Sequence, residues 1–187
     1  MEPERCGWCL SSPLSRDYHD REWGVPVHDD RKQFEFLVLE SAQAGLSWIT
    51  ILKKRENYRR AYHDFDPEKT ARFDETDVLR LLGDAGIVRN RRKIEASITN
   101  AAAFLRIVEE FGSFSSYIWD FVDGKAVRGS PRELADIPAR TELSDRVSAD
   151  LKKRGFRFLG SVIVYSHLQA VGVVNDHLTS CFRYQKL

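Results

Sequence analysis

Apolar side chains recur at intervals of three and four residues along most of the chain. This spacing places them on one face of an α-helix. The first clear example carries Phe34, Leu37 and Val38, begins after Asp29 and ends near Gly45. An aspartate can cap a helix start, and glycine is common just past a helix end. The same spacing continues almost to the C-terminus, so the pattern predicts a largely helical protein.

Eight further helices are expected, at Ser47, Asp66, Asp74, Asn90, Ser113, Ser130, Ser144 and Val162. The inward face of the long helix after Asn90 is predicted to hold Ile94, Ile98, Ala101, Ala102, Leu105 and Val108. Residues 162–174 are almost wholly apolar and are expected to form a buried core helix, too short to cross a bilayer. Strand signals are nearly absent, so the expected fold class is all-α.

Length and composition fit one globular unit. The 187 residues, 42% hydrophobic and 30% charged, can form a substantial core, and we expect a single domain over residues 1–187. No membrane segment or signal peptide is expected. Three cysteines give no disulfide framework, which favours a reducing cytoplasmic location. We expect a monomer.

Basic residues are clustered although the net charge is only +1. Three segments are rich in them: Lys53, Lys54, Arg55, Arg59 and Arg60; Arg89, Arg91, Arg92 and Lys93; and Lys152, Lys153, Arg154 and Arg157. A near-neutral total argues against a protein that coats nucleic acid with its whole surface. Segregated charge can still present one basic face to a phosphate backbone, although such clusters are often only solvated helix faces.

Four residues with the chemistry of zinc ligands lie near the two ends of the chain: Cys6, His19, His177 and Cys181. The i, i+4 spacing of His177 and Cys181 would place both on one face of a helical turn. Two Cys and two His form a closed tetrahedral shell, which serves structure rather than catalysis. The alternative is a set of unrelated buried thiols and scattered histidines.

Cys9 makes a second motif with Cys6, since Cys6-Gly-Trp-Cys9 is a CxxC. A thioredoxin-like redox pair needs a preceding strand, and only five residues precede Cys6, so that interpretation is rejected. Spacing alone leaves open whether Cys6 or Cys9 is the ligand.

A helix–turn–helix at residues 81–94 could hold an anion. The turn contains Gly86 and leads into a helix start surrounded by Arg89, Arg91, Arg92 and Lys93. Free backbone N–H groups and the positive end of the helix dipole favour a phosphate there. Such a contact grips the DNA backbone without reading sequence. The alternative is a corner between two helices with a solvated basic turn.

Glu40 is predicted on the inner half of an amphipathic helix, where a bare carboxylate is costly and needs a partner or a function. Aromatic residues are available around it: Trp8, Tyr18, Trp23 and Trp48. A carboxylate among aromatic faces suits a flat cationic guest through stacking, cation–π attraction and charge pairing. The alternative is a glutamate paired with an arginine while the tryptophans fill the core.

Together these segments resemble the zinc-containing DNA-3-methyladenine glycosylase I family of the helix-hairpin-helix glycosylase superfamily. The similar runs are residues 6–8, 18–26, 43–50, 52–59, 84–87 with 93–94, 151–156 and 174–177. They follow one another in order over almost the whole chain.

The resemblance implies one structural zinc ion held by Cys6, His19, His177 and Cys181, with Cys9 as a spectator thiol. The termini, residues 1–28 and 174–187, would then form a zinc-clamped sub-lobe. No cofactor beyond the metal is implied.

The resemblance also implies a base-excision-repair enzyme that binds alkylated double-stranded DNA and hydrolyses the N-glycosidic bond of a flipped-out 3-methyladenine, its product. Glu40 would read the base, with Tyr18 and Trp48 stacking on it and Trp8 and Trp23 lining the pocket. A non-catalytic module that binds alkylated DNA or free methylated purines is the alternative.

Two positions depart from the family pattern: Ser15, where tyrosine is frequent, and Ala42, where glutamine is frequent. Ser15 would open the stacking cage on one side and alter the range of bases accepted.

Overall fold

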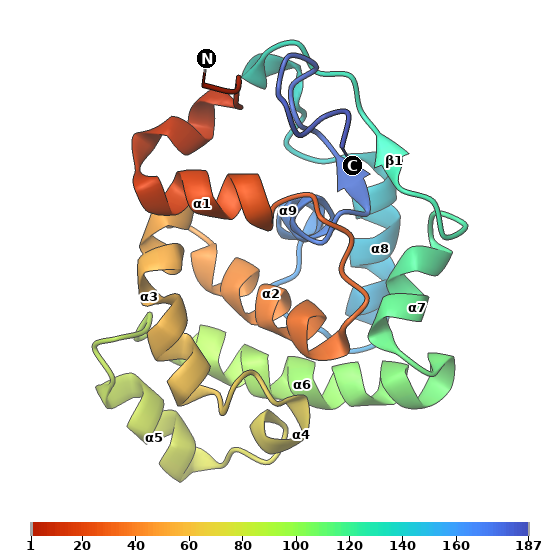
Figure 1. The fold of residues 1–187 in the computed structure, drawn as a ribbon. Helices are drawn as coiled ribbons and strands as arrows, with labels where there is room; N and C mark the ends of the chain where they lie inside the picture. Colours follow the sequence, from red (N-terminus) through yellow and green to blue (C-terminus); the bar gives the residue numbers. More distant parts are fainter. Residues whose placement is uncertain (1, 187) are drawn as a thin grey trace.

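The computed structural model describes residues 2–186, which form a predominantly helical fold (Figure 1). The α-helices are α1 (Pro13–Arg21), α2 (Asp30–Gln43), α3 (Trp48–Ala61), α4 (Pro67–Thr70), α5 (Glu75–Gly83), α6 (Arg91–Phe111), α7 (Phe114–Asp120), α8 (Glu142–Lys153) and α9 (Ser161–Ala170). Two 3-10 helices, η1 (Gly7–Ser11) and η2 (Leu134–Asp136), and two short strands, β1 (Val127–Arg128) and β2 (Val174–Asn175), complete the described elements. The all-α prediction is confirmed.

Most predicted helix starts are correct because their caps form. The side chains of Asp29, Asp66, Asp74, Asn90 and Ser113 each accept a hydrogen bond from a backbone N–H in the first turn of the helix that follows. Each bond satisfies one of the N–H groups that a helix start leaves without an intrahelical partner.

The predicted start of α8 is wrong by three residues. Thr141 caps it, and Ser144 is its partner in a reciprocal capping box: each hydroxyl accepts a hydrogen bond from the other's backbone N–H.

The helix predicted at Ser130 is also wrong, apart from the short η2. The backbone there bonds to the C-terminal segment instead. Gly129 N–H donates to the Asn175 carbonyl at 3.0 Å, and Thr179 N–H donates to the Pro131 carbonyl at 2.8 Å.

The apolar run at residues 162–174 is shorter as a helix than predicted. Helix α9 ends at Ala170, and Val174–Asn175 pair in parallel with Val127–Arg128. Gly172 makes the break with φ of +75°, and a Cβ there would lie 2.5 Å from Pro26 N. Glycine is suited to this backbone conformation, and here it also allows close contact with the N-terminal segment.

The buried face of α6 is rotated from the predicted one. Ile94 and Ala101 are buried as expected, but Phe104 and Ile107 are buried as well, whereas Ile98, Ala102, Leu105 and Val108 are only half-buried. Phe104 stacks on Phe114 of α7 with ring centroids 4.4 Å apart, so the aromatic contact with α7 sets the orientation. The helix α1 was not predicted, since its nine residues contain only Leu14 and Tyr18 as large apolar positions.

Helix α2 lies at the centre of the fold and packs against α3, α6, α7 and α9 (Figure 1). Its residues 33–42 are all buried. The two ends of the chain meet at one side of the molecule, where Phe182 N–H donates to the Glu4 carbonyl at 2.9 Å (Figure 1). One region of the molecule is therefore bordered by the C-terminal half of α2, the start of α3 and the two ends of the chain.

We expect Gly172→Ala to destabilise the fold by more than Gly112→Ala. Both glycines have positive φ, but a Cβ at Gly112 would meet no atom within 4 Å. The Gly112 variant should therefore lose only about 1–2 kcal/mol from the left-handed backbone. The Gly172 variant adds a clash with residues 24–26, and denaturant unfolding of both proteins measures the difference. Equal losses of unfolding free energy in the two variants would contradict the clash expected at Gly172.

Candidate functional site

The structure brings Cys6, His19, His177 and Cys181 together in one buried cluster whose candidate ligand atoms lie within 4.8 Å of one another. Cys6 Sγ lies 3.6 Å from His177 Nδ1. Cys181 Sγ lies 3.5 Å from His19 Nε2 and 3.6 Å from His177 Nδ1. Residues separated by more than 150 positions thus share one site.

These separations fit the edges of a metal tetrahedron. Typical zinc–sulfur and zinc–nitrogen bonds of about 2.3 and 2.0–2.1 Å at tetrahedral angles give a sulfur–nitrogen edge of about 3.6 Å. The three measured sulfur–nitrogen distances are 3.5–3.6 Å. The cluster is therefore compatible with a four-coordinate metal.

The surrounding groups orient the ligand atoms. His19 Nδ1 contacts Asp20 Oδ1 at 2.8 Å, and His177 Nε2 contacts the Trp23 carbonyl at 3.2 Å, so each ring turns its other nitrogen toward the cluster. Backbone N–H groups of Leu178 and Arg183 donate to the sulfurs of Cys6 and Cys181. Partners of this kind fix the tautomer and the ring orientation at metal sites.

Cys9 is buried but does not belong to the cluster. The predicted helical turn at His177 and Cys181 is wrong: residues 176–181 form an irregular segment with a turn in which Cys181 N–H donates to the Leu178 carbonyl. Burial raises the pKa of the Cys6 thiol to about 12 and lowers that of His177 to about 4. Without a cation, the site therefore favours neutral side chains.

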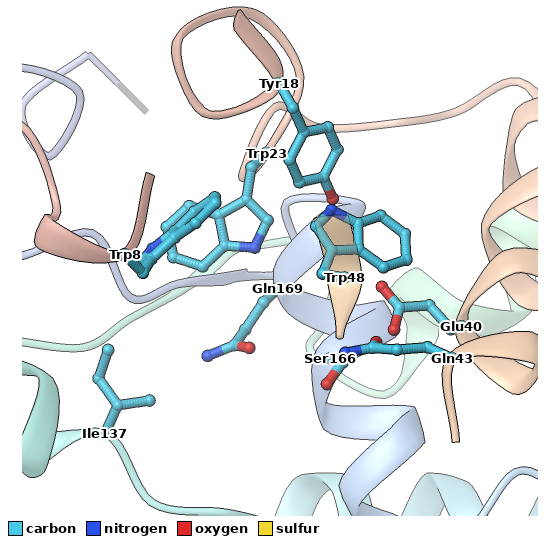
Figure 2. Close-up of a pocket in the computed structure, with 9 residues that line it drawn as sticks. All are labelled: Trp8, Tyr18, Trp23, Glu40, Gln43, Trp48, Ile137, Ser166 and Gln169. Carbon is cyan, nitrogen blue, oxygen red and sulfur yellow. The ribbon is translucent and has the colours of Figure 1, made fainter. Parts of the chain in front are cut away.

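A cavity of about 230 Å³ opens beside this cluster. Its lining residues are Trp8, Tyr18, Trp23, Glu40, Gln43, Trp48, Ile137, Ser166 and Gln169 (Figure 2). Sites for drug-sized ligands usually have about 300–1,000 Å³, so this cavity suits a smaller guest such as one nucleobase.

Aromatic rings wall the cavity on two sides (Figure 2). Trp8 and Trp23 meet edge to face with centroids 5.1 Å apart, and Tyr18 lies 5.3 Å from Trp48. Trp8, Tyr18 and Trp23 come from the N-terminal segment that also supplies Cys6 and His19. The metal-type cluster and the aromatic wall are thus parts of one structural unit.

Glu40 lies in the last turn of α2, and its carboxyl group reaches the cavity beside Trp48 (Figure 2). The residue is only 3% exposed, and its Oε2 finds no hydrogen-bond partner among residues 2–186. Burial raises the pKa of Glu40 to about 8. A buried polar atom without a partner is costly and points to a ligand or a function.

Glu35, five residues earlier in α2, is a buried carboxylate that does have ionic partners. It is equally buried, but Arg55 Nε lies 2.7 Å from its Oε1, and Lys32 and Arg59 pair with it as well. The alternative of an arginine-paired Glu40 therefore does not hold in this structure, since the ion pairs of the described residues leave Glu40 out.

Gln43, Ile137, Ser166 and Gln169 also line the cavity and were not predicted as site residues. Ser166 and Gln169 interrupt the apolar run of α9 at i, i+3, and this polar pair was the signal that could have revealed a functional face. Gln169 Nε2 donates to Asp176 Oδ2 at 2.8 Å, and the Tyr165 hydroxyl bonds to the same oxygen. Asp176 therefore fixes which way the Gln169 amide faces.

The two departures from the family pattern lie outside the cavity lining. Ser15 is buried in the first turn of α1, where its backbone N–H and hydroxyl both bond to Ser12 Oγ. Ala42 is buried in α2.

The predicted helix–turn–helix is formed by α5, residues 84–90 and α6. Its glycine allows close packing, because a Cβ on Gly86 would lie 2.8 Å from Asn57 Cγ and from Asp84 Oδ1 and would force these side chains to shift. Much of the turn's backbone is satisfied internally, since the N–H groups of Gly86, Ile87, Val88 and Asn90 all have partners. Fewer of them are free for an anion than the sequence suggested.

The four basic residues of this turn face different surroundings. Arg89 and Arg92 are exposed and form no ion pair within the described part of the chain. Arg91 is paired with Glu75 at 2.9 Å and with Glu95 at 3.3 Å. Lys93 is half-buried and turns its ammonium toward α2.

The fold is helical, and its aromatic-walled cavity has the size of a single nucleobase. The family profile described as methyladenine glycosylase matches residues 8–184. The chain belongs to the methyladenine glycosylase family.

Similar proteins agree with this assignment. The chain is 51% identical over 181 residues to DNA-3-methyladenine glycosylase 1 of Escherichia coli (strain K12), covering 97% of each chain. A crystal structure of 3-methyladenine DNA glycosylase I superposes with a TM-score of 0.93 at 52% identity, covering 96% of this chain and 98% of that one. A variant of such an enzyme in complex with 3-methyladenine has a TM-score of 0.92 at 40% identity, covering 95% and 96%.

Among residues 2–186, no helix is both long and apolar enough to span a membrane.

We expect Glu40→Gln to change how stability depends on pH. Because the folded-state pKa of Glu40 is raised to about 8, the folded protein holds one more proton than the unfolded chain between about pH 5 and 8. The free energy of unfolding contributed by this group therefore falls as pH rises, by up to about 1.4 kcal/mol per pH unit. The variant should lose this slope, as measured by urea unfolding from pH 5 to 8. If the free energy of unfolding changed with pH in the same way for both proteins, Glu40 would not be held neutral in the folded state.

Proposed function

We propose that this chain excises 3-methyladenine from alkylated double-stranded DNA and that Glu40 recognises the base. The observation that carries this proposal is the buried, unpartnered carboxyl group at an aromatic cavity of nucleobase size. The activity named for the similar bacterial enzyme and the 3-methyladenine complex of a related structure support it. Because a stacked base cannot be reached inside a duplex, the nucleotide must rotate out into the cavity.

The charge of the lesion explains the choice of residues. Methylation at N3 gives the adenine a positive charge, and Tyr18 and Trp48 offer π faces that attract a flat cation. Burial holds the Glu40 carboxyl neutral in the empty cavity, and an entering cation favours its ionised form. The carboxylate can then accept hydrogen bonds from the exocyclic amine of the base.

The same charge makes the bond easy to break. When the C1′–N9 bond breaks, its electron pair goes to N9 and the base leaves neutral. The sugar is left as an oxocarbenium-like cation that water captures, with loss of one proton to solvent. The protein therefore needs little acid catalysis. Its main contribution is to select and hold the lesion.

We propose that Cys6, His19, His177 and Cys181 hold one zinc ion. The two thiols, the two imidazoles and the sulfur–nitrogen distances fit zinc. Four protein ligands leave no position for water, so such an ion serves structure. It would clamp residues 1–28 to residues 174–187 within a single monomeric domain of residues 1–187.

The clamp has a direct use at the cavity. The ligands Cys6 and His19 are interleaved in sequence with Trp8, Tyr18 and Trp23. Fixing the ligands fixes this aromatic wall opposite Glu40.

DNA binding by the turn between α5 and α6 remains a proposal. Arg89 and Arg92, with their exposed cations, are the best placed for phosphates, and Gly86 allows the tight turn. Arg91 would have to exchange its pairs with Glu75 and Glu95 for a phosphate.

Glu40→Gln should lower release of 3-methyladenine from alkylated DNA by about 10- to 150-fold. This is the range for losing a hydrogen bond to a charged group, about 1.5–3 kcal/mol. Chromatography of released bases measures it, and Glu35→Gln is unsuitable as a control because it breaks an ion-pair network. If the unaltered protein released no base, the non-catalytic module that binds alkylated DNA or free methylated purines would be favoured. Unchanged release by the Glu40 variant would assign Glu40 a structural role.

Cys181→Ser should lose the bound zinc and destabilise the protein, because a structural ion contributes directly to folding. Cys9→Ser is the matched control, since this buried thiol lies outside the cluster. Metal analysis and thermal unfolding of both variants give the comparison. Full zinc content in the Cys181 variant, or equal loss in both, contradicts the ligand assignment.

A further inference from the structure

The Lys93 side chain points toward the C-terminal end of α2. Its Nζ donates to the Ala42 carbonyl at 2.9 Å and to the Ala44 carbonyl at 2.6 Å. Ala42 belongs to the last turn of α2 and Ala44 is its C-cap residue, and helix geometry leaves C=O groups at this end without intrahelical partners. A cation at this end also interacts favourably with the helix dipole. Lys93 thus acts as a C-terminal cap supplied by another helix.

The turn that Lys93 holds carries much of the cavity. Glu40 lies just before residues 42–45 on α2, Gln43 lies within them, and Trp48 begins α3 three residues after them. The turn is tight: Leu46 N–H donates to the Gln43 carbonyl at 2.6 Å, and Gly45 has φ of +80°. A change in the path of residues 42–45 would move the carboxyl group and the indole relative to each other.

From these contacts we infer that Lys93 is a positioning residue, which joins the α5–α6 turn to the base cavity and makes no phosphate contact. The inference rests on the proposed function of the cavity. It changes the role expected of Lys93 from its sequence position among Arg89, Arg91 and Arg92.

A contact between Lys93 and a phosphate would remove the cap that Lys93 forms at the end of α2. To reach a phosphate, Lys93 would have to break two hydrogen bonds and leave two helix-end carbonyls without these donors. Its neighbours Arg89 and Arg92 already present exposed cations and need no such rearrangement. Burial lowers the pKa of Lys93, as expected for an ammonium withdrawn from water.

Other contacts make the same connection to α3. Lys54 Nζ donates to the Ala85 carbonyl at 2.8 Å, Asn57 Nδ2 donates to the Gly86 carbonyl at 3.2 Å, and Val88 N–H donates to the Tyr58 hydroxyl at 3.1 Å. The turn and the start of α6 are therefore tied to α2 and α3, the helices that contribute Glu40 and Trp48 to the cavity lining. Gripping DNA at the turn would place the cavity at a fixed distance from the gripped strand.

Binding of free 3-methyladenine without DNA separates the two roles, because a phosphate contact has no part in it. Trp8, Trp23 and Trp48 line the cavity, so quenching of tryptophan fluorescence reports binding. Lys93→Met keeps the length of the stem and removes the donors. It should weaken free-base binding by about tenfold or more, since small displacements of site residues are costly. The salt dependence of its duplex binding should match that of the unaltered protein.

Arg92→Met is the matched control one residue away. It should leave free-base binding unchanged and reduce the slope of log affinity against log salt by about 1. Unaltered free-base binding by Lys93→Met, together with a similarly reduced salt slope, would overturn the inference.

Lys93→Gln covers the case in which the methionine variant does not fold. Its amide retains N–H donors but carries no charge. We expect free-base affinity closer to the unaltered protein and an unchanged salt slope, whereas a phosphate contact would lose slope in this variant too. If the unaltered protein itself neither binds free 3-methyladenine nor releases it from alkylated DNA, the proposed function fails. If it does both and Lys93→Met matches it in free-base binding, only the role of Lys93 fails.

Discussion

The cost of keeping the Glu40 carboxyl group away from water without a partner is the constraint on which the site depends. A carboxyl group in such a position would normally turn toward solvent or recruit a cation. Here the surrounding structure prevents both. Helix α2 is central and buried over residues 33–42, and the arginines that pair with this helix at Glu35, Arg55 and Arg59, are engaged there, Arg55 also by Glu22. The packing of the whole domain therefore keeps the Glu40 carboxyl group at the cavity without a hydrogen-bond partner for its Oε2 among residues 2–186.

The two buried glutamates of α2 differ in their charged neighbours. Glu35 is surrounded by Lys32, Arg55 and Arg59, and Glu22 shares two of these partners. This network absorbs the cations on one side of α2 and leaves the cavity side free of them among the lining residues. A guest that brings its own positive charge is the natural partner for the remaining carboxyl group. The proposed selectivity for a charged lesion would then depend on where the arginines are, as well as on where Glu40 is.

Local sequence signals predicted much of the fold and some of the site. Caps such as Asp29, Asp74 and Asn90 act within one turn, so their sequence neighbourhood was sufficient. The prediction errors lie where contacts between residues far apart in sequence determine the structure. Residues 174–175 leave the helical pattern because they pair with residues 127–128. The buried face of α6 is rotated by the stacking of Phe104 on Phe114. Likewise Ser166 and Gln169 reach the cavity only through the packing of α9, and the inward turn of Lys93 depends on carbonyls some fifty residues away.

The meeting of the chain ends has a consequence for the order of events during synthesis. Trp8, Tyr18 and Trp23 are made early, whereas His177 and Cys181, which complete the cluster beside them, are synthesised more than 150 residues later. The proposed clamp can therefore fix the aromatic wall only after these two residues have been made. A nascent chain that has not reached them, or one truncated before them, would carry Glu40 and the basic turn but no finished pocket.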